Sequence, residues 1–193
     1  MNDIVTVVED VWGPAFEDLS ARHTVIREPD AWSESDRLAE LMRSSAVVGI
    51  RNRTQLTAEL MRQSPELKLI ARAGVGLDNI DLVAADELGI VVVAALGANA
   101  TSVAEHALGL ALTVARHTVP LDREVREGRW NRLSGRELAG GTWGLLSAGA
   151  TARATARLAR GLGMDIVAVD PDVTPDAPAL TALGGRGGPR HAG

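Results

Sequence analysis

The residues that could do chemistry in this chain begin with the stretch 144–170, "GLLSAGATARATARLARGLGMDIVAVD". It reads as a strand, a tight loop, a helix and a second strand that ends in an acid. In a dinucleotide-binding loop the first glycine makes the turn, the second lets a diphosphate approach the backbone, and the third lets helix and strand pack closely. Ser147, Gly149 and Ala152 hold these three positions.

The loop also has residues suited to phosphate and ribose. The helix after Gly149 presents free N–H groups at Ala150 and Thr151 and a partial positive charge, and the Thr151 hydroxyl could add a hydrogen bond. Asp170 lies 21 residues after Gly149, where its carboxylate could accept from ribose hydroxyls and would repel a 2′-phosphate. The pattern therefore predicts a site for NAD rather than NADP. A βαβ unit that merely contains a tight glycine turn is the alternative.

Ser147 is the weak position of this loop. If the turn requires a positive φ, a serine there is strained by roughly 1 kcal/mol or more, because only glycine adopts such angles freely.

A second glycine cluster, "ARAGVGLDNID", covers residues 71–81. Gly74 and Gly76 flank Val75 just after a strand, at the edge where α/β sheets place ligands. Successive N–H groups of such a turn can hold a carboxylate. The alternative is a plain turn from strand to helix.

The elements that must position these loops follow a β-α-β-α rhythm. Short β-branched runs predict parallel strands that are apolar on both faces, and patterns with apolar spacing of three and four separate them. The runs lie at 4–8, 46–50, 67–71 and 90–94. We therefore expect an α/β fold.

A longer helix is expected after these strands. Ser102 and Glu105 fit a capping box at its start, and Pro120 ends its apolar pattern. The mixed charges of 121–141 are typical of a solvated surface segment, with a basic binding patch as the alternative. The glycine-rich end, 185–193, is expected to be disordered.

Composition narrows the class of protein. The 193 residues are 46% hydrophobic and 23% charged, the net charge is −5, and there is no cysteine. We expect a cytoplasmic protein that binds neither nucleic acid nor membrane, since the charge is unfavourable for both and no run approaches the roughly 20 apolar residues of a membrane helix. The N-terminus lacks the basic start of a signal peptide.

Several motifs together resemble the D-isomer-specific 2-hydroxyacid dehydrogenases, in particular the branch of D-3-phosphoglycerate dehydrogenases. They are "RNRTQLTAEL", "LKLIARAGVGLDNIDLVAADELGIVVV", "ATSVAEHALGLAL", "EGRWNR" and "ELAGGTWGLL". The resemblance implies a flavodoxin-like substrate domain at 1–98, an incomplete Rossmann-type NAD-binding domain at 99–184 and an active site between them.

The resemblance also implies roles for individual residues. Gly74, Val75 and Gly76 would offer N–H groups to the carboxylate of a small 2-hydroxy or 2-oxo acid, with Val75 also near the cofactor. Arg51 would face the acidic end of the substrate. The loop at 149–151 would hold the diphosphate of NAD, and Asp170 its ribose. The family usually has glycine at position 147 and often arginine at position 150, so Ser147 and Ala150 depart from its pattern.

The family's catalytic histidine, glutamate and arginine follow the second strand of the cofactor domain. Only 23 residues follow Asp170 here, and no glutamate follows Glu137. We assign no catalytic role to Arg186, Arg190 or His191, because the glycine-rich end cannot hold a side chain in place. The other histidines are expected within a helix, at a helix end or on the surface, and we assign no metal site because no two histidines have the spacing of metal ligands. The four histidines are His23, His106, His117 and His191.

Three hypotheses follow. The chain is an NAD-binding dehydrogenase that transfers hydride at C2 of an acid such as 3-phosphoglycerate, or a non-catalytic NAD-sensitive interaction module, or a C-terminally truncated product. In each case strands without neighbours leave an unpaired sheet edge that tends to associate with another chain. We therefore expect a homo-oligomer, such as a dimer, or a partner over the exposed sheet edge.

Overall fold

The computed structural model describes residues 4–171, 173, 186 and 187. The chain divides into two compact units, residues 1–96 and residues 97–193. No helix among the described residues is long and apolar enough to cross a membrane.

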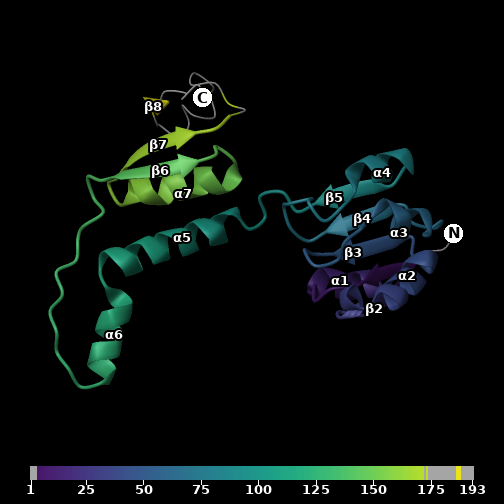
Figure 1. The fold of residues 1–193 in the computed structure, drawn as a ribbon, viewed down its shortest axis with the longest axis horizontal. Coiled ribbons are helices and arrows are strands. Elements are labelled where there is room, and N and C mark those ends of the chain that lie inside the picture. The colour runs from purple at the N-terminus through teal and green to yellow at the C-terminus, as the bar shows by residue number, and fades with distance from the viewer. Residues whose placement is uncertain (1–3, 172, 174–185, 188–193) are drawn as a thin grey trace. The chain divides into compact units, whose positions relative to one another are not determined.

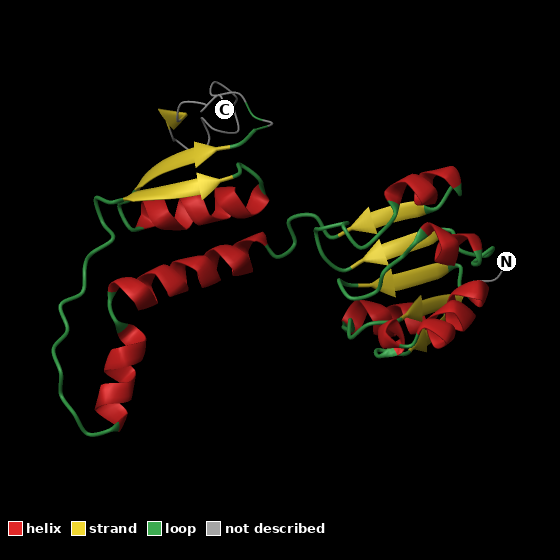
Figure 2. Ribbon diagram, in the orientation of Figure 1, coloured by secondary structure: helices red, strands yellow, loops and turns green. Residues whose placement is uncertain are grey.

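The first unit is a five-stranded parallel sheet in the order β2-β1-β3-β4-β5, and Figure 2 shows its arrows pointing the same way. The strands of this unit, labelled in Figure 1, are β1 (Ile4–Val7), β2 (Thr24–Arg27), β3 (Val47–Ile50), β4 (Leu69–Arg72) and β5 (Val91–Ala94). The helices are α1 (Pro14–Ser20), η1 (Ala31–Ser33), α2 (Ser35–Ser44), α3 (Ala58–Arg62) and α4 (Leu82–Glu87). A single parallel sheet brings the carboxyl ends of its strands to one edge.

Burial differs between the middle and the edges of this sheet. Val7, Val48 and Ile70 on the inner strands are fully buried, as expected for strands covered on both faces. The prediction of two buried faces is wrong for β5, where Val91 and Val93 are 56% and 50% exposed, because β5 is an edge strand. The other edge strand, β2, was not predicted, since its sequence "TVIR" has polar ends that face solvent.

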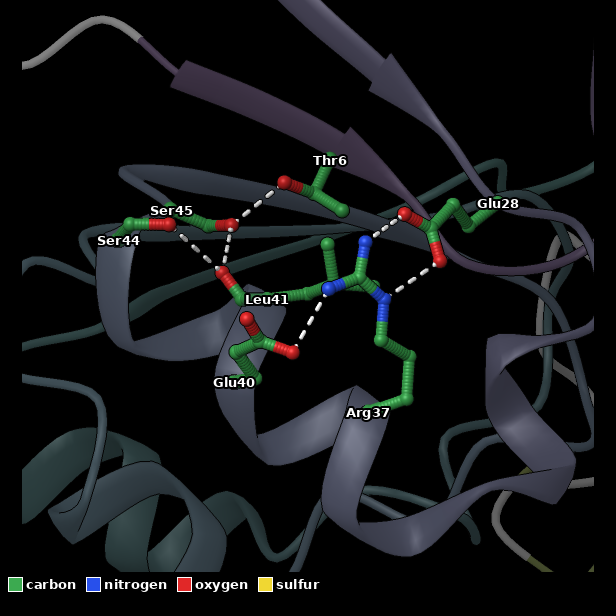
Figure 3. Close-up of polar contacts among 7 residues, drawn as sticks. All are labelled: Thr6, Glu28, Arg37, Glu40, Leu41, Ser44 and Ser45. Carbon is green, nitrogen blue, oxygen red and sulfur yellow. Dashed lines mark hydrogen bonds and ion pairs between the residues drawn. The ribbon is translucent and has the colours of Figure 1, made fainter.

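Helix α2 is fixed to the sheet by polar contacts at both of its ends (Figure 3). Near its C-terminus, the Ser45 hydroxyl bonds the Thr6 hydroxyl of β1 and donates to the Leu41 carbonyl. Near its N-terminus, the Arg37 guanidinium donates to both carboxylate oxygens of Glu28, just after β2. These contacts hold α2 against β1 and the end of β2.

The second unit contains the βαβ element expected at 142–170. It has strands β6 (Thr142–Leu146), β7 (Asp165–Val169) and β8 (Arg186–Gly187), and helices α5 (Ala100–Ala115), α6 (Thr118–Arg126) and α7 (Ala150–Gly161). The strands are parallel in the order β6-β7-β8. Helices α5 and α7 pack through small side chains, Ala104 against Ala154, with Leu158 beside them. Apart from Arg186 and Gly187, the predicted disordered tail lies outside the described residues.

Two predictions made from the sequence of this unit are wrong. Helix α5 begins at Ala100 after Asn99, so Ser102 and Glu105 are exposed residues within the helix and the capping-box prediction is wrong. Pro120 does not end the helical pattern either. It lies in the first turn of α6, where a proline ring is tolerated, and the break between the helices falls at His117 with φ 54°.

Candidate functional site

A buried carboxylate organises the loop that carries Arg51. Glu9 follows β1, is only 2% exposed, and accepts hydrogen bonds from four successive backbone N–H groups after β3. Its Oε1 accepts from Arg51 at 2.8 Å and Thr54 at 3.0 Å, and its Oε2 accepts from Asn52 at 3.2 Å and Arg53 at 3.1 Å. The Thr54 hydroxyl also donates to Oε1, at 2.9 Å. One carboxylate thus fixes the whole turn.

These contacts require the charged form of Glu9. Burial raises the pKa of its carboxyl, but hydrogen bonds from Thr54, Arg51 and Arg53 outweigh that effect, so the pKa lies below its ordinary value of 4.5. Sequence reasoning missed Glu9. The signal was present as an acid directly after the first buried strand, in "VVED".

The loop with Arg51 and the loop with the second glycine cluster are bonded together. The Asn79 amide donates to the carbonyls of Arg51, at 3.3 Å, and Thr54, at 2.8 Å. Leu56 and Ile80 form a parallel bridge just beyond. The structure therefore brings two of the predicted substrate-binding segments to the same edge of the sheet.

The glycine cluster lies against an arginine. A Cβ at Gly74 would sit 1.6 Å from the guanidinium of Arg72, so the absence of a side chain lets Arg72 fold over the backbone. Among the described residues the Arg72 Nε is a buried atom without a hydrogen-bond partner. Val75 and Gly76 are exposed. The Gly74 N–H donates to the Arg72 carbonyl at 2.9 Å, so this edge offers the exposed backbone of Val75 and Gly76 beside a partly buried cation.

A cavity of about 470 Å³ lies beside the Arg51 turn. Arg51 and Arg53 line it together with Trp32, and the Arg53 guanidinium lies 4.8 Å from the centre of the Trp32 ring. Asp10 and Asp30 also line it, so it presents both signs of charge. Arg51 is exposed and can reach an anion.

In the second unit, the loop between β6 and α7 is closed by its own groups. The Ser147 N–H donates to the Val169 carbonyl at 2.7 Å, and the Ala148 N–H donates to Asp170 Oδ2 at 2.7 Å. The Gly149 N–H donates to the Ser147 hydroxyl oxygen at 3.1 Å. The loop and the terminal acid of β7 therefore lie side by side, at the ends of paired parallel strands.

The backbone angles of this loop show at which of its positions the fold favours glycine. Ser147 has φ 113°, the conformation that favours glycine, as anticipated for a tight turn. Gly149 has φ −69°, which any residue adopts. Among the described residues other than its chain neighbours, an added Cβ would meet only the Ser147 hydroxyl oxygen, at 3.5 Å. Folding therefore does not require glycine at 149. A side chain there would instead fill the space over the start of α7.

That space suits the phosphates of a dinucleotide. No side chain caps the N-terminus of α7, whose N–H groups and partial positive charge favour an anion. A cavity of about 440 Å³ runs along α7 from Ala150 to Arg160 beside the start of α5, and Arg153, Arg157 and Arg160 line it. These three arginines form no ion pair within the described part of the chain. The residues present fit an anionic cofactor.

The remaining candidate residues are Thr151 and the histidines. Thr151 is half-buried at the start of α7, His23 and His106 are exposed, and His117 is half-buried. His191 and Arg190 lie outside the described residues. Within the described ranges, no group of three or more histidine, aspartate or glutamate residues could hold a metal ion.

Comparison with known proteins connects these loops to a family. The family model "D-isomer specific 2-hydroxyacid dehydrogenase, catalytic domain" matches residues 4–169. A hydroxypyruvate reductase of Thermotoga maritima is 43% identical over 140 residues, which are 72% of this chain and 46% of that protein. A D-3-phosphoglycerate dehydrogenase of Archaeoglobus fulgidus is 37% identical over 172 residues, which are 88% of this chain and 32% of that protein.

The fold matches as well. An NAD-dependent formate dehydrogenase from Staphylococcus aureus, solved in complex with NAD, is similar with a TM-score of 0.74 and 28% identity over 91% of this chain and 58% of that one. The chain thus spans less than half the length of the two curated relatives named above. The family uses NAD(P) and acts on 2-hydroxy or 2-oxo acids. The match over residues 4–169 and the identities to both relatives show that this chain belongs to the D-isomer specific 2-hydroxyacid dehydrogenase family.

Proposed function

We propose that this chain is an NAD-binding protein that carries the cofactor-binding and acid-binding loops of a D-2-hydroxyacid dehydrogenase. In this proposal residues 1–98 form the substrate-binding domain and residues 99–184 a partial Rossmann-type domain. The reaction that these loops serve is hydride transfer at C2 of a small 2-hydroxy acid. The nicotinamide, when bound, accepts or supplies that hydride.

The observation that carries the proposal is the hydrogen bond of 2.7 Å from the Ala148 N–H to Asp170. It supports a site in which the turn before α7 and the acid after β7 act on one ligand. The backbone at Gly149 and the N–H groups of Ala150 and Thr151 would hold the diphosphate. The Asp170 carboxylate would accept from the adenosine ribose and disfavour a 2′-phosphate, so NAD is the expected cofactor.

The acid would bind at the first unit. An exposed arginine, Arg51, on a turn fixed by Glu9 supports recognition of a carboxylate or phosphate, since a guanidinium pairs with either in bidentate geometry. The N–H groups of Gly74, Val75 and Gly76 would take the substrate carboxylate, and Val75 would also contact the cofactor. 3-Phosphoglycerate and hydroxypyruvate are the acids to test first, because both relatives' names point to them.

Calorimetric titration with NADH and with NADPH tests the proposal. We expect NADH to bind with 1:1 stoichiometry and NADPH to bind at least tenfold more weakly. Loss of NADH absorbance with 3-phosphohydroxypyruvate, hydroxypyruvate and glyoxylate then tests turnover. Absence of NADH binding to the folded chain would remove the proposal.

A non-catalytic, NAD-sensitive interaction module is the second candidate. Apolar side chains on α5 and α6 are exposed, with Leu110 at 53%, Val114 at 72% and Val125 at 56%, and such surfaces commonly mark association. Binding of NADH without turnover, together with a change of mass in light scattering when NADH is added, would favour this candidate. Turnover with any of the three acids would favour the dehydrogenase.

A further inference from the structure

The turn before α7 has its glycine and its serine at unexpected places. The backbone favours glycine at 147, where φ is 113°, and accepts any residue at 149, where φ is −69°. The chain has serine at 147 and glycine at 149. A serine in that conformation is strained, and such strain persists only where the surroundings over-determine it.

The Ser147 hydroxyl has a specific partner. Its oxygen accepts the Gly149 N–H at 3.1 Å, two residues further along the chain. The space beside Gly149 is open, since a Cβ there would meet no described atom outside the adjacent residues within 4 Å except that same hydroxyl oxygen. The hydroxyl oxygen therefore lies where a phosphate oxygen would have to be to accept this hydrogen bond.

The neighbouring N–H is also engaged, because Ala148 donates to Asp170 at 2.7 Å. A phosphate that approaches the turn finds two of its backbone donors already bonded within the protein. The N–H groups of Ala150 and Thr151, at the uncapped start of α7, are the ones left to it.

We infer that the Ser147 hydroxyl competes with the cofactor diphosphate for the Gly149 N–H, so that Ser147 weakens dinucleotide binding by this chain. The inference rests on the proposed function, because the ligand is the same NAD. Its physical basis is that a ligand which must replace an existing hydrogen bond gains only the difference between the two bonds. A residue without the hydroxyl leaves the N–H open.

Two substitutions separate competition from backbone strain. Ser147→Ala removes the hydroxyl and keeps a side chain at φ 113°, whereas Ser147→Gly removes the hydroxyl and relieves the strain. Calorimetric titration with NADH should give a dissociation constant several-fold to about tenfold lower for both variants than for the unmodified chain. In the absence of NADH, only Ser147→Gly should raise the melting temperature, and the Gly149 amide should exchange with solvent faster in both variants.

The outcomes are distinct. An equal or higher dissociation constant for Ser147→Ala overturns the inference and leaves the proposed function standing, because it would mean that the hydroxyl is neutral or binds the ligand itself. Tighter binding by Ser147→Gly alone also overturns it, since strain would then be the cause. A failure of all three proteins to bind NADH overturns both the inference and the proposed function.

Discussion

Replacement of Glu9 by glutamine tests the buried carboxylate that fixes the Arg51 turn. Glutamine keeps one acceptor oxygen but loses the charge and turns an NH2 group toward the N–H donors of Asn52 and Arg53. Hydrogen bonds to a charged group contribute about 1.5–3 kcal/mol each, and an unsatisfied buried donor costs about 1–3 kcal/mol. Because solvent can reach part of the turn, we expect Glu9→Gln to lower the free energy of unfolding by about 2–4 kcal/mol at pH 7.

Urea denaturation followed by tryptophan fluorescence measures this loss, and the exposed Glu66→Gln is the matched control. The pKa of Glu9 is lowered in the folded state, so its contribution is present above the ordinary value of 4.5 and is lost as the pH falls through the folded pKa. The difference between the wild-type chain and Glu9→Gln should therefore shrink below about pH 4.5. Amides 51–54 should also exchange faster in the variant. A loss below about 0.5 kcal/mol that does not change with pH would show that the charge of Glu9 does not stabilise the turn.

Three further predictions concern the ligands. Asp170→Asn keeps an acceptor for the Ala148 N–H but removes the charge, so in calorimetry the preference for NADH over NADPH should fall by about tenfold, and an unchanged ratio would exclude Asp170 as the ribose acid. Arg51→Gln should raise the apparent dissociation constant of 3-phosphoglycerate by about tenfold or more while NADH affinity stays the same, and equal losses for both ligands would contradict the assignment of Arg51 to the acid. Gly74→Ala must displace the Arg72 guanidinium, so it should weaken acid binding measured in the same titration, and wild-type affinity would show that the close approach is unimportant.

The parallel sheet and the βαβ element were predictable from sequence because inner strands are continuous apolar runs. The run at Val47–Ile50 is an example, and its buried face needs no information from elsewhere in the chain. Edge strands carry no such signal. Strand β2 has exposed polar ends, and β5 has the composition of a buried strand, although its neighbour on one side is absent.

The candidate site also has residues that the sequence predicts and residues that it does not. The positions of Ser147, Gly149 and Asp170 follow from spacing, because a tight turn and a terminal acid are local features of one βαβ element. The role of Glu9 could not be predicted, because its partners lie 42 to 45 residues away along the chain and meet it only through the pairing of β1 with β3. The misplaced capping box at Ser102 shows the opposite error, a local pattern that the helix start at Ala100 overrides.

In the proposed function, a dinucleotide places its diphosphate over the start of α7. Gly149→Ala tests this placement, because the added methyl group fills that space and, among the described residues other than its chain neighbours, meets only the Ser147 hydroxyl oxygen, at 3.5 Å. The gain from a stiffer unfolded chain and the loss of a preferred N-cap residue nearly offset each other, so stability should change by less than about 0.5 kcal/mol. Calorimetry should show NADH affinity reduced at least tenfold in this stable variant. Wild-type affinity in Gly149→Ala would mean that the diphosphate does not lie over the start of α7.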